Sequence, residues 1–294
     1  VNVIGAGGDR VRAGYIAGAG GNAALMGITR ALGAVSIDQG VRVVGVNPGA
    51  VETDRLVEMA RVNAQARFGD AGRWRIVPSG TSLDESNERG DKAALRGKLG
   101  LERDAVWAGS LLRLEHVKGP DVFLEAAGRL KDNTRLRFVA IGDGSMREAL
   151  RRRIAQLGLQ KSFLLAGHQE DIWSWLGALD IYVQPSRNEG MGRALIQAQS
   201  LGLPAAASRV CGIPDVAKEG EGGLLVPPGD PAALANAIRA LADDPARRED
   251  LGQRGRKWVR ENDELGLRRF SHETMAERLR LLYHDILKGQ AKRS

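Results

Sequence analysis

The acidic, glycine-rich segment at 189–192 contains residue types that suit a ligand bearing both hydroxyls and phosphate. The carboxylate of Glu189 can accept hydrogen bonds from two sugar hydroxyls. Gly190 and Gly192 leave room for a ligand to approach the backbone closely. A helix is predicted to start at Arg193, and the unpaired N–H groups and positive dipole at such a start favour a phosphate. The segment therefore predicts a ligand site.

The elements around this segment place it at the edge of a sheet. The apolar run Ile181–Val183 predicts a strand, and Arg193–Leu201 predicts a helix because it contains neither Gly nor Pro. A further short strand is predicted at Ala205–Ser208. In an open α/β sheet, ligands bind outside the carboxyl ends of the strands, which is where such a loop lies.

The phrases PSRNEGMGRALIQA, GLPAAAS and GGLLVPPGDPAALANAI resemble the donor-binding domain of family-four retaining glycosyltransferases of the GT-B fold. The resemblance extends from about Ile76 to Lys288. In that family one glutamate touches the transferred sugar and a second holds the nucleotide ribose. Glu189 matches the first, whereas Gln197 stands at the second position and carries no charge. The resemblance implies a catalytic role for Glu189 and donor contacts from the residues that follow it: Gly190, Met191, Gly192, Arg193 and Gln197.

A second polar loop, Arg113–Gly119, follows a strand predicted at Ala105–Leu112. The resembled family uses this loop to supply an Arg and a Lys that grip the donor pyrophosphate, and Arg113 and Lys118 match those positions. The chemistry fits, since two cations neutralise the charge that builds on a departing nucleoside diphosphate. The alternative interpretation is an ordinary solvated Arg and Lys in a surface loop.

Two more loops follow predicted strands and carry candidate donor contacts. The resemblance implies that Gly142 and Gly144 line the nucleotide side and that the loop of Gly167 and His168 meets the nucleobase. The alternatives are a tight turn in which Ser145 caps the next helix, and an ordinary surface histidine.

Strands and helices alternate from Ile76 to Lys288, which predicts about six parallel strands in a doubly wound, Rossmann-like α/β sheet. Later helices are predicted at Pro231–Leu241, with Asp230 as its cap, at Ala246–Trp258 and at Thr274–Leu287. The sequence contains no Asp-x-Asp triplet and no His/Cys cluster, so no metal site is predicted.

The first 75 residues form a partial α/β segment in this reading, with strands at Val1–Ile4 and Val41–Val46 and a helix at Ala23–Gly33. The phrases GNAALMGITRALG and GVRVVGVNPGAVETDRL resemble the second half of a short-chain dehydrogenase/reductase. Its cofactor-side turn is matched by three residues: Pro48, Gly49 and Thr53.

The catalytic Ser, Tyr and Lys positions of that second family fall on Gly5, Gly18 and Asn22, so we predict no hydride chemistry. A shifted pair of Tyr15 and Asn22 is the alternative. The predicted domains are 1–75, 76–288 and a basic tail at 289–294. Because the glycosyltransferase family has an acceptor domain before this boundary, the sequence predicts a chimeric or truncated chain.

The composition of the 294 residues is that of an ordinary soluble globular protein, with 43% hydrophobic and 27% charged residues. Cys211 is the single cysteine, and no apolar run is long enough to span a bilayer, which favours the cytoplasm. The net charge of +7 predicts attraction to anionic partners, including peripheral contact with the inner membrane face, or else only solvated helix faces. No base-stacking pattern of aromatic residues interleaves the arginines and lysines, so no nucleic-acid partner is predicted.

Three functions are compatible with these patterns. The first is a donor-binding domain for retaining glycosyl transfer that uses a UDP- or GDP-sugar, no cofactor, and an acceptor glycan or lipid-linked sugar. The second is a sugar-nucleotide-binding module without catalysis. The third is an NAD(P)-dependent short-chain oxidoreductase, which only the first segment supports.

Overall fold

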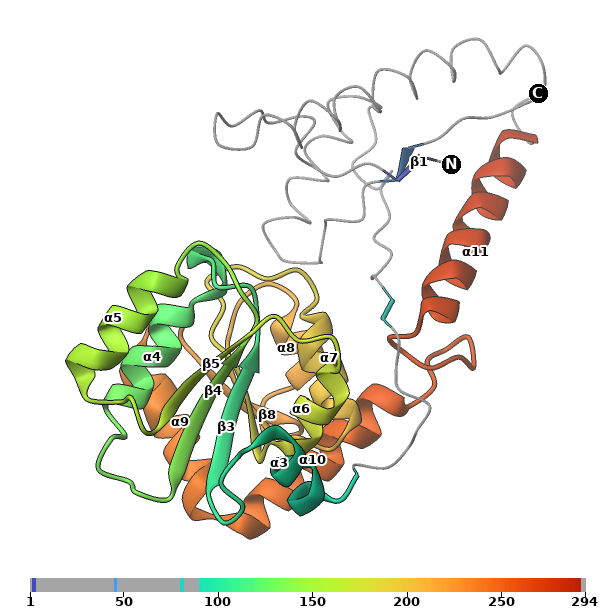
Figure 1. Ribbon diagram of the computed structural model, residues 1–294. Helices are drawn as coiled ribbons and strands as arrows, with labels where there is room; N and C mark the ends of the chain where they lie inside the picture. Colours follow the sequence, from blue (N-terminus) through green and yellow to red (C-terminus); the bar gives the residue numbers. More distant parts are fainter. Residues whose placement is uncertain (1, 4–44, 47–79, 82–89, 292–294) are drawn as a thin grey trace. The chain divides into compact units, whose positions relative to one another are not determined.

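The computed structural model describes residues 2–3, 45–46, 80–81 and 90–291 (Figure 1). The chain divides into two compact units, Val1–Ile76 and Val77–Ser294. In the first unit, β1 (Asn2–Val3) and β2 (Gly45–Val46) pair in parallel. The dehydrogenase-like positions at 5–22 and 48–53 lie outside the described residues, and their roles stay predictions.

The second unit is built on six parallel strands in the order β5-β4-β3-β6-β7-β8. Their bounds are β3 (Val106–Leu111), β4 (Leu136–Ile141), β5 (Phe163–Gly167), β6 (Ile181–Gln184), β7 (Ala205–Ser208) and β8 (Gly223–Val226). The chain runs from β3 outward to β5 and then returns to the other side of β3 to add β6. The strand order therefore reverses between β3 and β6, and the predicted doubly wound α/β sheet is confirmed.

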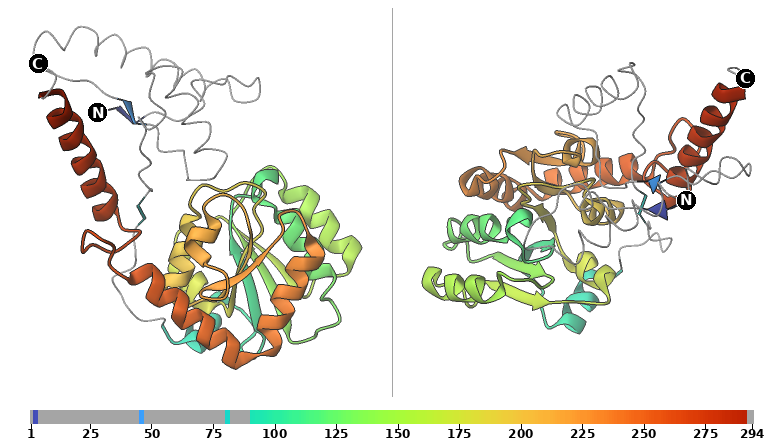
Figure 2. Two further views of the ribbon diagram at one scale, coloured as in Figure 1. Left: turned by 180° about the vertical axis from the view of Figure 1, so that it is seen from behind. Right: turned by 90° about the horizontal axis from the view of Figure 1, so that it is seen from above.

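Helices cover both faces of this sheet (Figures 1 and 2). The helical elements in the described part of this unit are α3 (Lys92–Leu99), the 3₁₀ turn η4 (His116–Lys118), α4 (Pro120–Gly128), α5 (Arg147–Leu157), α6 (Ile172–Ala178), α7 (Arg193–Ser200), α8 (Ile213–Ala217), α9 (Pro231–Asp243), α10 (Pro245–Arg260) and α11 (His272–Ala291). Figure 1 shows α4, α5 and α9 on one face and α6 and α7 on the other. Within the described ranges, no helix has the length and apolar character needed to cross a membrane.

Local chemistry explains several element boundaries. Asp230 accepts hydrogen bonds from the backbone N–H groups of Ala232 and Ala233, which confirms the predicted cap of α9. Helix α3 was not among the predicted elements because polar contacts, not an apolar stripe, hold it. Its buried Arg96 donates to the carbonyl of Ala178 and, at 2.5 Å, to the carboxylate of Asp180.

The core between α4 and the strands β4 and β5 contains an aromatic cluster. Phe123 of α4 lies with its ring centroid 5.2 Å from that of Phe163 and 6.1 Å from that of Phe138. All three side chains are buried. Dense packing of this kind holds α4 firmly against the sheet.

Candidate functional site

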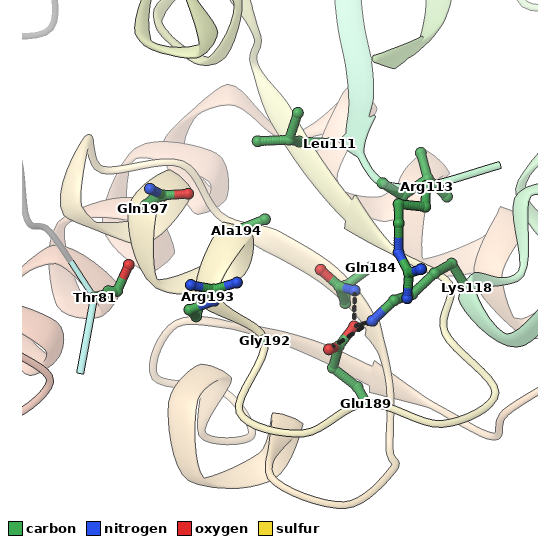
Figure 3. Close-up of a pocket in the computed structure, with 11 residues that line it drawn as sticks. Thr81, Leu111, Arg113, Lys118, Gln184, Glu189, Gly192, Arg193, Ala194 and Gln197 are labelled. Atoms are coloured by element: carbon green, nitrogen blue, oxygen red, sulfur yellow. Dashed lines mark hydrogen bonds and ion pairs between the residues drawn. The ribbon is translucent and has the colours of Figure 1, made fainter. Parts of the chain in front are cut away.

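A cavity of about 370 Å³ opens at the carboxyl edge of the sheet, where the strand order reverses (Figure 3). Residue 81, the ends of β3 and β6, the loops after those strands and the start of α7 supply its lining. The lining residues are Thr81, Leu111, Leu112, Arg113, Lys118, Gln184, Glu189, Gly192, Arg193, Ala194 and Gln197. The fold thus brings together six of the residues named from the sequence: Arg113, Lys118, Glu189, Gly192, Arg193 and Gln197.

An ion pair between Lys118 and Glu189 forms one side of this cavity. Lys118 Nζ lies 2.8 Å from each carboxylate oxygen of Glu189, and both side chains are mostly shielded from solvent. Glu189 Oε2 also accepts hydrogen bonds from Gln184 Nε2 at 3.0 Å and from Ser186 Oγ at 3.1 Å. Three donors therefore hold this carboxylate in one orientation.

Beneath Glu189, a buried hydrogen-bond chain orients the Gln184 amide. The Tyr182 hydroxyl lies 3.0 Å from Gln184 Oε1, to which it donates, and 3.3 Å from the carbonyl oxygen of Leu111. Because Oε1 accepts from Tyr182, the amide Nε2 is turned toward Glu189. Burial, with the nearby charge of Glu189, raises the pKa of Tyr182, so the phenol stays a donor. The sequence analysis did not name Tyr182, which lies inside the predicted apolar strand, or Gln184, which directly follows that strand.

The start of α7 lies on the cavity wall. Gly192 precedes the helix with φ +67°, a left-handed conformation that glycine adopts without strain. No side chain in the described part of the chain caps α7, and its first N–H groups are therefore available to an anion. Figure 3 shows Thr81 and Gln197 across the cavity from Lys118 and Glu189, with Arg193 between the two groups.

Gly142 and Gly144 lie outside the lining of this cavity and serve close backbone contacts. A Cβ atom at Gly142 would lie 2.0 Å from the carbonyl oxygen of Leu112, and one at Gly144 would lie 2.6 Å from that of Leu114. Both glycines therefore let the loop after β4 pack against the loop that carries Arg113. A role in donor binding stays a prediction for both.

The suggested capping of α5 by Ser145 is wrong. The residue that precedes α5 is Met146, and no side-chain hydrogen bond caps the helix in the described chain. Ser145 instead donates to Glu115, through its N–H at 2.9 Å and its hydroxyl at 2.7 Å. Those bonds, the backbone one first, lower the pKa of Glu115. A carboxylate from the neighbouring loop has thus drawn the serine away from the helix.

Four other residues named from the sequence also lie outside the lining of this cavity. The carbonyl of Gly167 accepts a hydrogen bond from the Gly142 N–H at 2.8 Å, so Gly167 makes a backbone contact with the loop after β4. His168 is exposed. Gly190 is exposed and Met191 is buried. Among the residues that the structure describes, no three His, Cys, Asp or Glu side chains gather as a metal site.

The family comparison matches this region of the chain. The model for glycosyl transferases group 1 covers residues 91–258, which include the whole six-stranded sheet and both site loops. The chain belongs to this family. Residues 91–258 are a glycosyltransferase group 1 domain, with the Rossmann-like α/β sheet expected for the C-terminal domain of the GT-B fold.

Two bacterial relatives of this glycosyltransferase domain have the name D-inositol 3-phosphate glycosyltransferase. The one from Geodermatophilus obscurus is 35% identical over 246 residues, which cover 76% of this chain and 54% of the relative. The one from Streptomyces avermitilis is 32% identical over 72% of this chain and 49% of its own length. The chain spans about half the length of these relatives.

Solved structures of glycosyltransferases share the fold. Anabaena HepE in complex with UDP superposes with a TM-score of 0.65 at 18% identity, over 87% of this chain and 67% of HepE. Sucrose-phosphate synthase from Thermosynechococcus elongatus gives a TM-score of 0.64 at 26% identity, over 79% of this chain and 57% of the synthase.

Proposed function

We propose that the unit 77–294 binds the diphosphate of a nucleotide sugar in the cavity between the β3 and β6 loops and serves retaining glycosyl transfer, as in family-four enzymes. One observation carries this proposal. Arg113 and Lys118 follow β3, Glu189 follows β6, and all three line one cavity beside the start of α7. This is the place where a doubly wound sheet binds nucleotides.

Each of these residues has a role that follows from its chemistry. The diphosphate would contact Arg113, Lys118 and the first N–H groups of α7, which together neutralise its charge. Glu189 would accept hydrogen bonds from hydroxyls of the sugar, and Gln197, on the opposite side of the cavity, would contact the ribose.

In the proposed reaction, the bond between the anomeric carbon and the diphosphate oxygen breaks. The acceptor hydroxyl oxygen forms its bond to the same face of that carbon, and its proton passes to an oxygen of the leaving phosphate. Arg113 and Lys118 stabilise the negative charge that develops on the leaving group, which is the step such preorganised cations accelerate.

UDP is the first nucleotide to test and GDP the second, because HepE was solved with UDP. The relatives' names contain D-inositol 3-phosphate, so that compound is the first acceptor to test. Contact with anionic lipid at the inner membrane face rests on the net charge of +7 alone. Sedimentation with anionic phospholipid vesicles would test it.

Calorimetric titration with UDP, GDP and ADP tests the donor site. We expect one diphosphate to bind, and the double variant Arg113→Ala/Lys118→Ala to weaken its binding by at least about 100-fold, or about 2.7 kcal/mol. Arg151→Ala, which removes an exposed cation on α5, is the control and should leave binding unchanged. A folded chain that binds none of the three would refute the proposal. Binding without sugar transfer to any acceptor would instead indicate a non-catalytic module.

A further inference from the structure

Two ion pairs join the same two loops, one at the cavity and one outside it. Lys118 pairs with Glu189, and three residues later Asp121, in the first turn of α4, pairs with Arg187. Each segment therefore contributes one cation and one anion. Sliding one segment along the other in one direction would bring Lys118 toward Arg187, and sliding it in the opposite direction would bring Asp121 toward Glu189. Like-charge repulsion therefore opposes a shift in either direction.

The Arg187 pair has the geometry of a rigid clamp. Its two terminal guanidinium nitrogens, Nη1 and Nη2, donate to the two carboxylate oxygens of Asp121 at 2.7 and 2.6 Å, and Nη1 also donates to the carbonyl of His116 at 2.9 Å. The backbone N–H of Arg187 donates to the carbonyl of Val117 at 2.9 Å. Burial raises the pKa of Asp121, but the hydrogen bond and charge of Arg187 outweigh it and lower the pKa overall. A bidentate pair with extra backbone bonds leaves little freedom to rotate.

Close backbone contact between the two loops restricts their relative position. Gly119 has φ +68°, and a Cβ atom there would lie 2.0 Å from the carbonyl oxygen of Pro185. The turn that presents Lys118 therefore lies directly against the segment that leads to Glu189. A small shift of either loop would move the ammonium away from the carboxylate.

The two ion pairs differ in what a ligand can reach. Lys118 and Glu189 line the cavity, whereas Arg187 and Asp121 lie outside its lining. A bound diphosphate would compete with Glu189 for the Lys118 ammonium, which is a flexible point charge. It would leave the Arg187–Asp121 fork intact.

We infer that Arg187 and Asp121 are positioning residues that keep the two loops in register while Lys118 exchanges Glu189 for a donor phosphate. The inference rests on the proposed function for the exchange step. The clamp itself can be tested without any ligand.

Hydrogen exchange measured on the full chain tests the clamp directly. In Arg187→Ala and in Asp121→Ala, we expect the backbone amides in 114–119 and 186–190 to exchange about tenfold faster than in wild type. A tenfold increase corresponds to a loss of about 1.4 kcal/mol in the free energy of local opening of the two loops. The double variant should show amide exchange no faster than either single variant does. The exchange rate in Arg187→Lys should lie between those of wild type and Arg187→Ala. The control is Arg153→Ala, which breaks another bidentate pair, between Arg153 of α5 and Glu125 of α4, outside the cavity lining. Unchanged exchange in both loops of Arg187→Ala overturns the inference, whether or not a nucleotide binds.

UDP titration distinguishes an effect of the clamp on ligand binding from a general loss of protein stability. We expect Arg187→Ala to bind UDP about tenfold more weakly than Arg153→Ala at a similar melting temperature. Equal UDP affinity in wild type and Arg187→Ala would refute the positioning role. A wild-type chain that does not bind UDP would count against the proposed function, while the exchange experiment would still decide the clamp.

Discussion

Lys118 Nζ lies 2.8 Å from both carboxylate oxygens of Glu189, although 71 residues separate them in the chain. The fold thereby pairs a cation and an anion that both line the cavity. Under the proposed function, ligand binding at this site would be an exchange of partners, in which a diphosphate would take the ammonium and leave the carboxylate to sugar hydroxyls.

Glu189→Gln should separate binding from transfer. The amide keeps the shape of the carboxylate but releases Lys118, so UDP affinity should stay the same or increase. Transfer should fall by about 100-fold or more, as when one preorganised polar group is lost from an active site. The measurements are the UDP dissociation constant and the initial rate of UDP release from UDP-sugar with acceptor. Weaker UDP binding in this variant would contradict the exchange of partners.

Tyr182→Phe should destabilise the unit by about 1–3 kcal/mol, because it leaves the buried Gln184 Oε1 without its donor. The matched control is Ser110→Ala. Its hydroxyl is buried in the neighbouring strand and has no hydrogen-bond partner among the described residues, so its removal should be close to neutral. The free energy of unfolding from urea titration checks both values. Equal losses in the two variants would show that the Tyr182 bond adds nothing.

Asp180 should make the stability of the unit depend on acid pH. Its carboxylate accepts from Lys92 and Arg96 and from the backbone N–H of Trp107. Burial raises the pKa of Asp180, but these partners, Lys92 first, outweigh it and lower the pKa below 3.8. A lowered folded-state pKa means that the unfolded chain binds the proton more readily. The stabilisation is therefore complete above about pH 4 and is lost as pH falls through the folded-state value.

The variant Asp180→Asn tests this dependence. At pH 7 it should cost about 3 kcal/mol, because the buried guanidinium of Arg96 loses its counter-charge. Unfolding free energies measured from pH 7 to pH 2 should show the difference from wild type shrinking below pH 4. Asp132→Asn, which changes an exposed carboxylate, serves as the control. A difference that is constant with pH would contradict the prediction.

Gly142→Ala should disturb the loops and not merely strain one residue. Gly142 has φ +134°, and the new Cβ would overlap the carbonyl oxygen of Leu112. Gly158→Ala is the matched control, because Gly158 has φ +72° with no atom within 4 Å of its Cβ position. We expect about 1 kcal/mol for the control from backbone strain and at least about 3 kcal/mol for Gly142→Ala. Thermal unfolding checks both, and similar losses would exclude a packing role.

Sequence patterns predicted most of the second unit. The strand Ala205–Ser208 has the bounds that were predicted, and Asp230 caps α9 as expected. Both depend on residues close in the chain: a short apolar run between turn residues, and a carboxylate two or three positions before the N–H groups it binds. Helix α3 was not predicted, because the buried Arg96 that holds it in place binds partners as far as 84 residues away in the chain.

The sequence by itself determined the candidates Arg113, Lys118 and Glu189, since the types of these residues and the phrases around them are local properties. Only the tertiary structure decided how they are held. Arg187 reads as one more solvated arginine until the fold places Asp121, 66 residues away, against its guanidinium. Gln184 is only the residue after a predicted strand until the fold shows that Tyr182 turns its amide toward Glu189. Hydrogen bonds between distant segments depend on strand order and loop packing, which local periodicity does not encode.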